Sequence, residues 1–200
     1  MRNRYLEIAT TPTVRTARLE IDGVDRYDAA DGALVNDRFG PAEAAFIAAR
    51  DSFYVASISE EGWPYMQHRG GPTGFLRVMD EHTLGFSDFR GNKQYITLGN
   101  TRVNPRVSLF LMDYARRRRL KIFGILSVSE DPAFAAKLRT PGYGATVERS
   151  IRIDVEAVDW NCPQHITPRF TEAEIALASA PLHQRIATLE AEVARLRDRI

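Results

Sequence analysis

The middle of the chain alternates between apolar and polar positions with a period of two, which is the pattern of a half-buried β-strand. The alternation begins at Ser52 and runs to Ile58. Glu60-Glu61-Gly62 follows, and it predicts a hairpin turn in which Gly62 takes a positive φ. Trp63–Arg69 continues as the partner strand, so an antiparallel hairpin is the first element that the pattern predicts.

Further strands are predicted after a break at Gly70–Gly74. Two of them form a second hairpin around the polar corner at 80–82, and three more follow at wider spacing. These strands are Phe75–Met79, Thr83–Ser87, Val107–Met112, Leu120–Val128 and Ser150–Val158. In the last strand Arg152, Asp154 and Glu156 alternate with apolar residues, which predicts that one side of the strand faces solvent.

Helices are predicted where proline or a short polar residue precedes an apolar stretch. The ranges that fit are 12–22, 41–50, 92–101 and 132–138. Thr171 and Glu174 form a capping box, so a further helix begins there. Residues 25–37 are polar and are predicted to form a loop.

The sharpest period lies at the C-terminal end. Its apolar residues alternate between spacings of four and three, which is the a/d seam of a coiled coil. The seam consists of Leu182, Ile186, Leu189, Val193, Leu196 and Ile200. Two interpretations are open: two such tails pair with each other, or each tail packs on the folded domain.

Six or seven strands, mostly joined by hairpins and with helices inserted between them, predict a mainly β fold with added helices. An antiparallel barrel fits this order, and a doubly wound parallel sheet does not. We expect an N-terminal extension with a short helix over residues 1–37, a barrel over 38–165 and a helical, coiled-coil tail over 166–200.

Composition narrows the function classes. The 27 basic and 26 acidic residues give a formal net charge of +1, so no basic excess points to nucleic acid or a membrane surface. Hydrophobic residues make up 44% of the chain, and no apolar run approaches the length of a membrane span. A single cysteine, Cys162, excludes an internal disulfide. We expect a cytoplasmic protein.

The short motifs of phosphate loops, dinucleotide folds, zinc proteases and serine hydrolases are absent. The four histidines, His68, His82, His165 and His183, show no ligand spacing, so no metal site is expected. Two other features keep a plain interpretation beside a functional one. The basic run 116–119 is a phosphate-contact patch or an exposed hairpin turn, and Cys162 is a redox thiol or a small packed side chain.

Three stretches combine polar side chains with turn residues, namely 67–72, 86–93 and 160–165. The second contains Gly91, and it leads from a predicted strand into a predicted helix. Free backbone N–H groups at a helix start attract anions, and Arg90 and Lys93 add positive charge, so a phosphate suits this stretch. An ordinary surface turn with solvated charges fits the same residues. The first stretch fits a pocket wall or a turn at the barrel rim.

Taken in this order, the stretches resemble the pyridoxamine 5′-phosphate oxidase-like family of FMN-binding split barrels. The resemblance covers about residues 38–165 and is carried by 51–64, 67–72, 86–93 and 104–109. The stretch 160–165 resembles a bacterial branch of that family. The resemblance implies a split β-barrel, bound FMN, and a homodimer with the FMN at its interface.

The resemblance also implies roles for single residues. Gln67, His68 and Arg69 would line the isoalloxazine ring or the phosphate, and Ser87 would face the cofactor. Residues that would reach the FMN of the partner subunit are Trp160, Asn161 and Gln164.

Two positions depart from the oxidase itself. Asn92 and Lys93 fall on the family's basic pair near the phosphate, but Asn92 stands where arginine is usual, and Arg90 would compensate. Arg119 falls where the oxidase tends to have a glutamine that contacts the flavin.

The implied function is an FMN-dependent oxidoreductase that transfers hydride through flavin N5 to or from a small molecule, with NADH or NADPH as a candidate donor. No residue stands out as a general acid or base. The basic and tyrosine residues that hold phosphorylated pyridoxamine in the oxidase have no counterpart near the C-terminus. The alternative is a non-catalytic flavin or haem carrier of the same barrel family, with His68 or His165 as the haem ligand.

Overall fold

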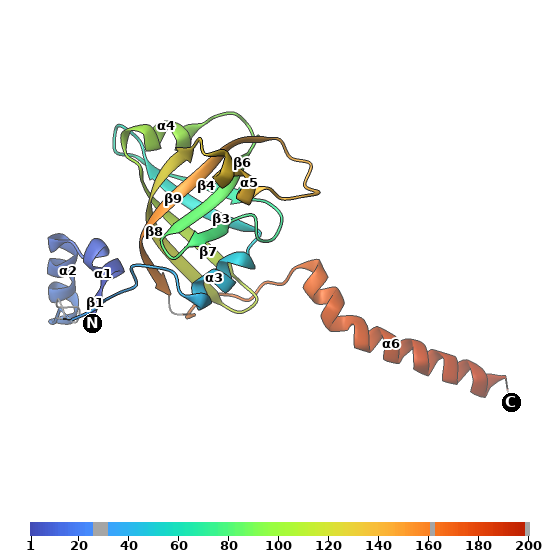
Figure 1. Ribbon diagram of the computed structural model, residues 1–200. Coiled ribbons are helices and arrows are strands. Elements are labelled where there is room, and N and C mark those ends of the chain that lie inside the picture. Colours follow the sequence, from blue (N-terminus) through green and yellow to red (C-terminus); the bar gives the residue numbers. More distant parts are fainter. Residues whose placement is uncertain (26–31, 161–162, 199–200) are drawn as a thin grey trace. The chain divides into compact units, whose positions relative to one another are not determined.

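A seven-stranded antiparallel sheet forms the body of the protein in a computed structural model that describes residues 1–25, 32–160 and 163–198. The sheet curls into a barrel, as Figure 1 shows. Its strands in spatial order are β4 (Pro64–Gly70), β3 (Ser52–Ile58), β7 (Arg106–Asp113), β8 (Arg118–Ser129), β9 (Val147–Trp160), β6 (Thr83–Phe89) and β5 (Arg77–Asp80). The predicted mainly β fold, antiparallel and with added helices, is confirmed.

Alternation along the strands fills the inside of this barrel. In β7, Val107, Leu109 and Leu111 are buried, whereas the residues between them lie on the outer face and are partly exposed. Phe53 and Phe86 meet them from other strands in one continuous apolar cluster. Burying each such side chain contributes roughly 1.5–3 kcal/mol, so the period-two pattern largely determines which side of each strand faces inward.

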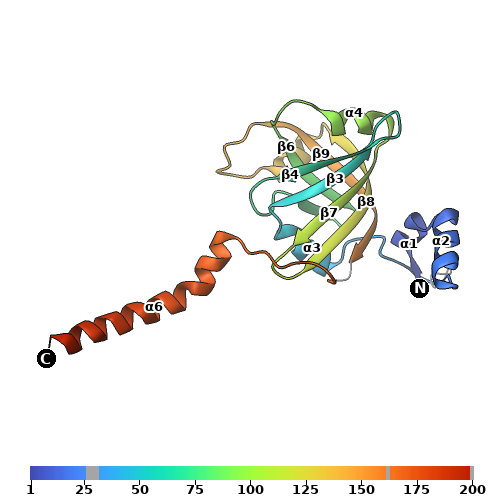
Figure 2. The same ribbon diagram turned by 180° about the vertical axis from the view of Figure 1, so that it is seen from behind.

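The helices are α1 (Arg4–Ala9), α2 (Pro12–Asp22), α3 (Pro41–Ala48), α4 (Ile96–Val103), α5 (Pro132–Leu138) and α6 (Glu172–Arg197). Figures 1 and 2 show α3 and α4 at opposite ends of the barrel. α5 covers β6 closely because Gly85 has no side chain there: a Cβ on Gly85 would lie 2.7 Å from Phe134 Cζ and 2.8 Å from Leu138 Cδ2.

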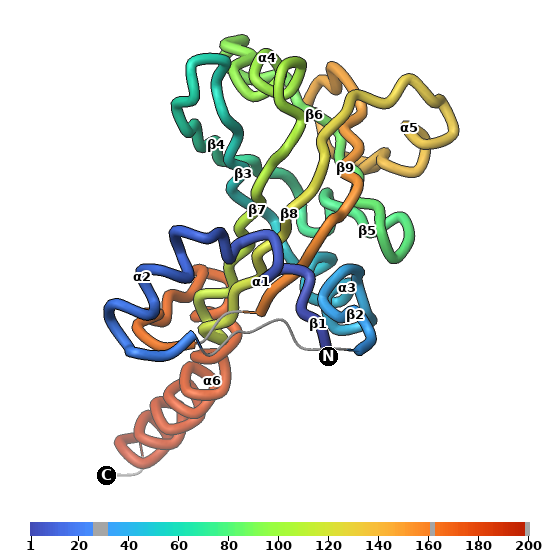
Figure 3. Tube along the Cα trace, turned by 90° about the vertical axis from the view of Figure 1, so that its left-hand side faces the viewer, coloured from blue at the N-terminus to red at the C-terminus, as the bar shows by residue number. Residues whose placement is uncertain are grey.

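The N-terminal segment packs on the outer face of the barrel, as the tube in Figure 3 shows. The ring of Tyr5 in α1 stacks on Phe123 of β8 at 4.5 Å, and Arg4 pairs with Glu156 of β9 at 3.0 Å. A short parallel pair, β1 (Arg2–Asn3) with β2 (Leu34–Val35), closes this segment. Neither α1 nor β2 was expected from the sequence.

Most predicted elements agree with the structure at their cores. Gly62 has φ 88° at the first hairpin, and α2 is capped by Thr11 and ends at Gly23, as predicted. Two predictions need correction. The helix expected over 92–101 begins only at Ile96, and β5 begins at Arg77 because residues 75 and 76 turn into the core instead.

Tyr114–Arg117 and Gln164–Ile200 form a second compact unit. Within it, the Arg169 guanidinium lies 4.8 Å from the centre of the Tyr114 ring. The predicted capping box is present at the start of α6: the Thr171 hydroxyl accepts from the Glu174 N–H at 3.2 Å, and the Thr171 N–H donates to the Glu174 carboxylate at 2.8 Å. None of the helices described is both long and apolar enough to cross a bilayer.

Candidate functional site

A cleft of about 200 Å³ opens between β4, the loop after β6, α4 and the start of β9. Four of the residues proposed from the sequence line it, namely Gln67, Arg69, Asn92 and Lys93. The other lining residues are Asp88, Phe89, Gly91, Tyr95, Leu98, Glu148 and Arg149. The structure therefore brings the first and second polar stretches of the sequence together in one place.

Strand alternation selects which residues of β4 reach the cleft. Gln67 and Arg69 are two residues apart and so lie on the same face of the strand. The Gln67 side-chain oxygen accepts hydrogen bonds from the Tyr65 hydroxyl at 3.1 Å and from the Thr97 hydroxyl at 3.5 Å, which ties β4 to α4. His68 lies on the opposite face, where its ring packs edge-on against Tyr54 with 5.5 Å between the ring centres.

The loop before α4 is a turn in the left-handed backbone region. Lys93 and Tyr95 have φ of 60° and 53°, and the Asn92 side chain accepts from the Gln94 N–H at 3.2 Å. This turn explains the late helix start, because Asn92 caps the turn instead of the helix. Left-handed non-glycine residues cost about 1–3 kcal/mol each and gather at ligand sites. Two of them in three residues mark this loop as a candidate binding element.

Asp88 is the centre of the charges in the cleft. It is 5% exposed, and its carboxylate accepts from Arg69 Nη1 and from Arg149 Nη1, each at 2.6 Å. The Nε of Arg69 is buried and has no hydrogen-bond partner among the described residues. The Lys93 side chain is exposed and makes no ion pair within the described part of the chain. The cleft is therefore lined by three cationic and two anionic side chains, and its net charge is positive. The cations are Arg69, Lys93 and Arg149, and the anions are Asp88 and Glu148.

Glu148 forms the second anionic wall. It accepts from Arg90 Nε at 3.1 Å, from the Tyr95 hydroxyl at 3.2 Å and from Arg149 Nη2 at 3.1 Å. Burial acts to raise the pKa of Glu148, but the hydrogen bonds from Arg90 and Tyr95 and the charge of Arg149 outweigh it and hold the pKa below its usual range. Glu148 is therefore ionised at neutral pH, and it forms an ion pair with Arg90 beside the cleft.

A larger hollow of about 470 Å³ adjoins the cleft and shares Leu98 and Arg149 with it. Its remaining walls come from α4 and the end of β8, and they include Arg102 and Glu130. The two hollows lie next to each other along α4, because Leu98 lines both.

Several residues proposed from the sequence lie elsewhere. Ser87 is covered by α5, and its hydroxyl donates to the Leu138 carbonyl at 3.3 Å. Arg119 lies on the outer face of β8 with its guanidinium 5.9 Å from the centre of the Phe110 ring, and its Nε is buried without a hydrogen-bond partner among the described residues.

Trp160, at the start of the third polar stretch, is also remote from the cleft. The Trp160 indole N–H donates to the Glu43 carboxylate, and its ring packs edge-on against Phe46 with 4.9 Å between the ring centres. Gln164 and His165 belong to the second compact unit and are exposed. Asn161 and Cys162 lie outside the described residues.

Sequence reasoning did not single out Asp88, Tyr95, Glu148 and Arg149. Asp88 lies within the polar stretch 86–93. Its place at the centre of the cleft charges, however, follows only from the register of β6 with β9, in which Asp88 is opposite Arg149. No local spacing links residues 61 positions apart in the chain, so only the sheet could have revealed them.

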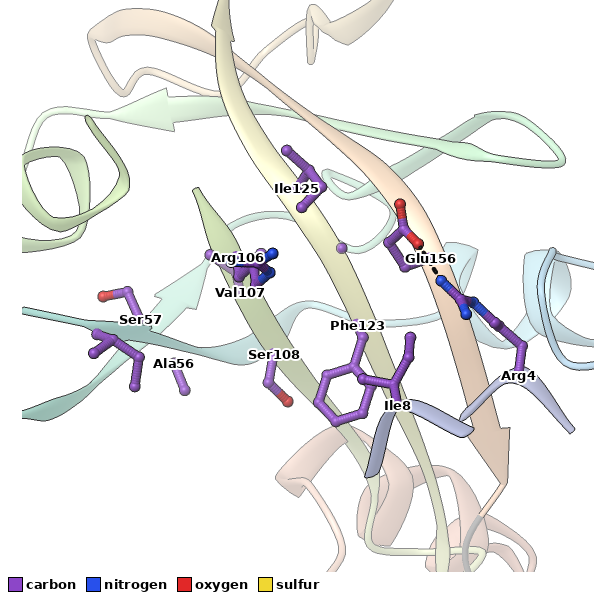
Figure 4. Close-up of a pocket in the computed structure, with 12 residues that line it drawn as sticks. Arg4, Ile8, Ala56, Ser57, Arg106, Val107, Ser108, Phe123, Ile125 and Glu156 are labelled. Carbon is purple, nitrogen blue, oxygen red and sulfur yellow. Dashed lines mark hydrogen bonds and ion pairs between the residues drawn. The ribbon is translucent and has the colours of Figure 1, made fainter. Parts of the chain in front are cut away.

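A separate pocket of about 460 Å³ lies on the outer face of the barrel, beneath α1. Figure 4 shows Ile8 and Phe123 among its walls and Arg4 extending toward Glu156. Arg4 and Glu156 already form an ion pair with each other, at 3.0 Å. It contains none of the residues proposed from the sequence, so we assign the candidate site to the cleft at Arg69.

The fold is a split barrel: an antiparallel β-barrel with helices inserted between its strands. The structure of HupZ from Group A Streptococcus is similar, with 16% identity, a TM-score of 0.50, and coverage of 66% of this chain and 99% of that one. The sequence model described as pyridoxamine 5′-phosphate oxidase matches residues 39–160, so the chain belongs to the pyridoxamine 5′-phosphate oxidase family.

Other solved structures resemble the chain more distantly. An FMN-binding protein from Syntrophomonas wolfei is 10% identical, with a TM-score of 0.45 over 58% of this chain and 81% of that one. HutZ, the haem storage protein from Vibrio cholerae, is 14% identical, with a TM-score of 0.41 over 61% and 94%. A search of curated protein sequences finds no match.

Proposed function

We propose that the chain is an FMN-binding flavoprotein whose cleft at Arg69 holds the cofactor phosphate, and that it works as an oxidoreductase. Family membership supports the flavin. The observation that carries the phosphate site is the donor set of the cleft: a partly satisfied Arg69, an unpaired Lys93 among the described residues, and Arg149 beside them. Charge-assisted hydrogen bonds from such groups are the usual way to bind a phosphate.

The size of the cleft agrees with one part of FMN. At about 200 Å³ it is smaller than the roughly 300–1,000 Å³ of a small-molecule site, so it suits a phosphate but not a whole flavin. The adjoining hollow of about 470 Å³ offers room for more of the ligand beside α4. The residues present therefore fit the group.

The remaining walls of the site would come from a second copy of the chain. Arg119 and Trp160 lie near one end of the β8–β9 pair, and Arg149 lies near the other, eleven residues along β9 from Trp160. At about 3.3 Å per residue this separation is on the order of 35 Å. The indole N–H of Trp160 is already bonded to Glu43, whereas Arg119 keeps a buried Nε without a partner among the described residues. We therefore propose a homodimer in which Arg119 of one copy approaches the flavin held by the other.

Bound FMN supplies hydride transfer at its N5 position. The chain's own residues would bind and orient it: Arg69, Lys93 and Arg149 would hold the phosphate end, and Arg119 of the second copy would place positive charge near the ring. Glu148 is ionised at neutral pH, so it accepts hydrogen bonds and holds no proton to donate. The substrate is a small molecule, and NADH or NADPH is the candidate electron donor.

The test compares FMN with riboflavin, which has the same ring but no phosphate. Purified protein is titrated with each ligand and followed by flavin fluorescence and visible absorbance. We expect FMN to bind at least about tenfold to a hundredfold more tightly, because each charge-assisted contact to the phosphate contributes roughly 1.5–3 kcal/mol. In Arg69→Met the preference should fall by about tenfold to a hundredfold, because one of these contacts is lost.

Equal affinity for FMN and riboflavin in the unchanged protein would remove the cleft as the phosphate site. A protein that binds neither ligand, but gains a Soret band with haem, would replace the flavin by the haem alternative. For the FMN-loaded protein, rapid bleaching on mixing with NADH or NADPH supports the oxidoreductase, and no bleaching with either contradicts a nicotinamide donor.

A further inference from the structure

The helix α6 carries a stripe of large apolar side chains that face solvent. Its members Leu182, Ile186, Leu189, Val193 and Leu196 are between 42% and 66% exposed. The apolar cluster of the barrel includes none of them. An apolar stripe on a single helix is unfavourable in water, because most of the stability of a helix comes from packing its apolar face. The stripe therefore requires a partner.

The residue types along the stripe specify the kind of partner. The spacing places Ile186 and Val193 at heptad position a, and Leu182, Leu189 and Leu196 at position d. β-Branched residues at a with leucine at d favour two parallel strands over three or four. Pro181 precedes the stripe and interrupts the helix ladder, so the paired segment begins after it.

The charges beside the stripe specify its orientation. Arg185 and Glu192 occupy position g, and Glu190 and Arg197 occupy position e. In a parallel pair, each g residue faces the e residue five positions later in the other helix. That rule joins Arg185 to Glu190 and Glu192 to Arg197, so both kinds of contact are attractive.

An antiparallel pair centred on the stripe would oppose like charges. Such a pair brings e to e and g to g, so Glu190 would meet Glu190 of the other copy, and Glu192 would meet Glu192. Like charges across the seam are unfavourable, so the charge pattern disfavours this antiparallel register while it supports the parallel pair.

We propose that α6 forms a parallel, in-register, two-stranded coiled coil with α6 of a second copy of the chain. The apolar segment spans only about 21 Å at 1.5 Å per residue, and a free coil of this length is marginal. Pairing is therefore expected when the two chains are also joined elsewhere, since that raises the effective concentration of one tail for the other. The proposal does not depend on the flavin.

The test uses cysteine cross-linking in the full chain, with Cys162→Ser in every variant to remove the native thiol. In a parallel, in-register coil, position 182 of one copy lies beside position 182 of the other. Leu182→Cys should therefore form a disulfide-linked dimer at least about tenfold faster than Gln184→Cys, whose position f points away from the seam. Non-reducing gels over a time course give both rates.

A mixture of Ile186→Cys and a size-tagged Leu196→Cys tests the opposite orientation. These positions meet only in an antiparallel pair, so no mixed dimer is expected. Rapid formation of the mixed dimer would overturn the parallel assignment. Equal, slow rates for Leu182→Cys and Gln184→Cys would overturn pairing altogether.

Charge variants in the Leu182→Cys background give a second check. Glu190→Arg places two cations opposite each other in the parallel coil and should slow cross-linking. Adding Arg185→Glu restores opposite charges across the seam and should recover the rate. Recovery supports the g-to-e contacts, and a rate that stays slow contradicts them.

Discussion

Two arginine–aspartate pairs in the barrel have similar geometry but different surroundings. Arg50, which follows α3, meets Asp113 at the end of β7 at 3.1 Å, and Arg69 meets Asp88 in the cleft at 2.6 Å. Both aspartates are buried, with side chains 6% and 7% exposed. Distance and burial alone would give both pairs the same role.

Their remaining donors separate them. Arg50 also donates from Nε to the Phe46 carbonyl at 3.2 Å and from Nη1 to the Met112 carbonyl at 2.9 Å, and its guanidinium lies 4.7 Å from the centre of the Phe46 ring. Arg69 has a buried Nε without a partner among the described residues, and Arg149 shares its aspartate. An arginine with every nitrogen engaged braces the fold, and one with capacity left over beside other cations indicates a binding site.

The largest effect on stability should come from removing Arg50, whose nitrogens are all engaged within the fold. Arg50→Met removes the Arg50–Asp113 ion pair and also the hydrogen bonds from Arg50 to the Phe46 and Met112 carbonyls, and removal of one member of a buried pair costs about 3–5 kcal/mol. Urea unfolding should show this loss in the free energy of unfolding. FMN affinity of the folded variant should stay unchanged, and a selective loss of FMN binding would show that the two pairs are not functionally distinct.

A smaller loss of stability but a larger loss of binding is expected at the cleft. Arg69→Met removes one bond to Asp88 and leaves Asp88 paired with Arg149, whereas Arg50→Met also removes two bonds to backbone carbonyls, so less stability is lost in Arg69→Met. The dissociation constant for FMN should rise about tenfold to a hundredfold, since a charge-assisted contact of roughly 1.5–3 kcal/mol is removed. Riboflavin affinity is the control and should not change. Unaltered FMN affinity would reassign Arg69 to a bracing role.

Lys93 sharpens the comparison because no described acid competes for it. Lys93→Gln replaces the ammonium by a neutral polar amide and should weaken FMN binding by about tenfold through the loss of one charged contact. The matched control is Lys137→Gln on the exposed side of α5. Calorimetric titration of both variants separates a local contact from a general effect of charge: similar weakening in the two would argue for the latter.

The smallest effect concerns pH. The pKa of Glu148 is lowered from 4.5 in the folded protein, so its stabilising contribution is complete above the unfolded pKa and disappears as the pH falls through the folded one. Below about pH 5, Glu148→Gln should therefore lose stability less steeply with falling pH than the unchanged protein. Urea midpoints at a series of pH values measure both slopes, and identical slopes would contradict the assignment.

Local chemistry explains why much of the fold was predictable. The first hairpin follows from the period of two and from a glycine with positive φ at Gly62, and the cap of α6 follows from Thr171 and Glu174. The start of α4 was predicted too early, at Asn92. Its side chain instead closes a turn at Gln94, and the left-handed residues Lys93 and Tyr95 delay the helix.

The sequence by itself determined the strands, the helix caps, the heptad seam and part of the candidate site, because these depend on residues within a few positions of one another. Only the tertiary structure decided which polar side chains act together. Alternation in β4 turned Arg69 toward the cleft and His68 away from it. The register of β6 with β9 brought Arg149 to Asp88. Such pairings depend on the packing of strands far apart in the chain, and no local pattern encodes them.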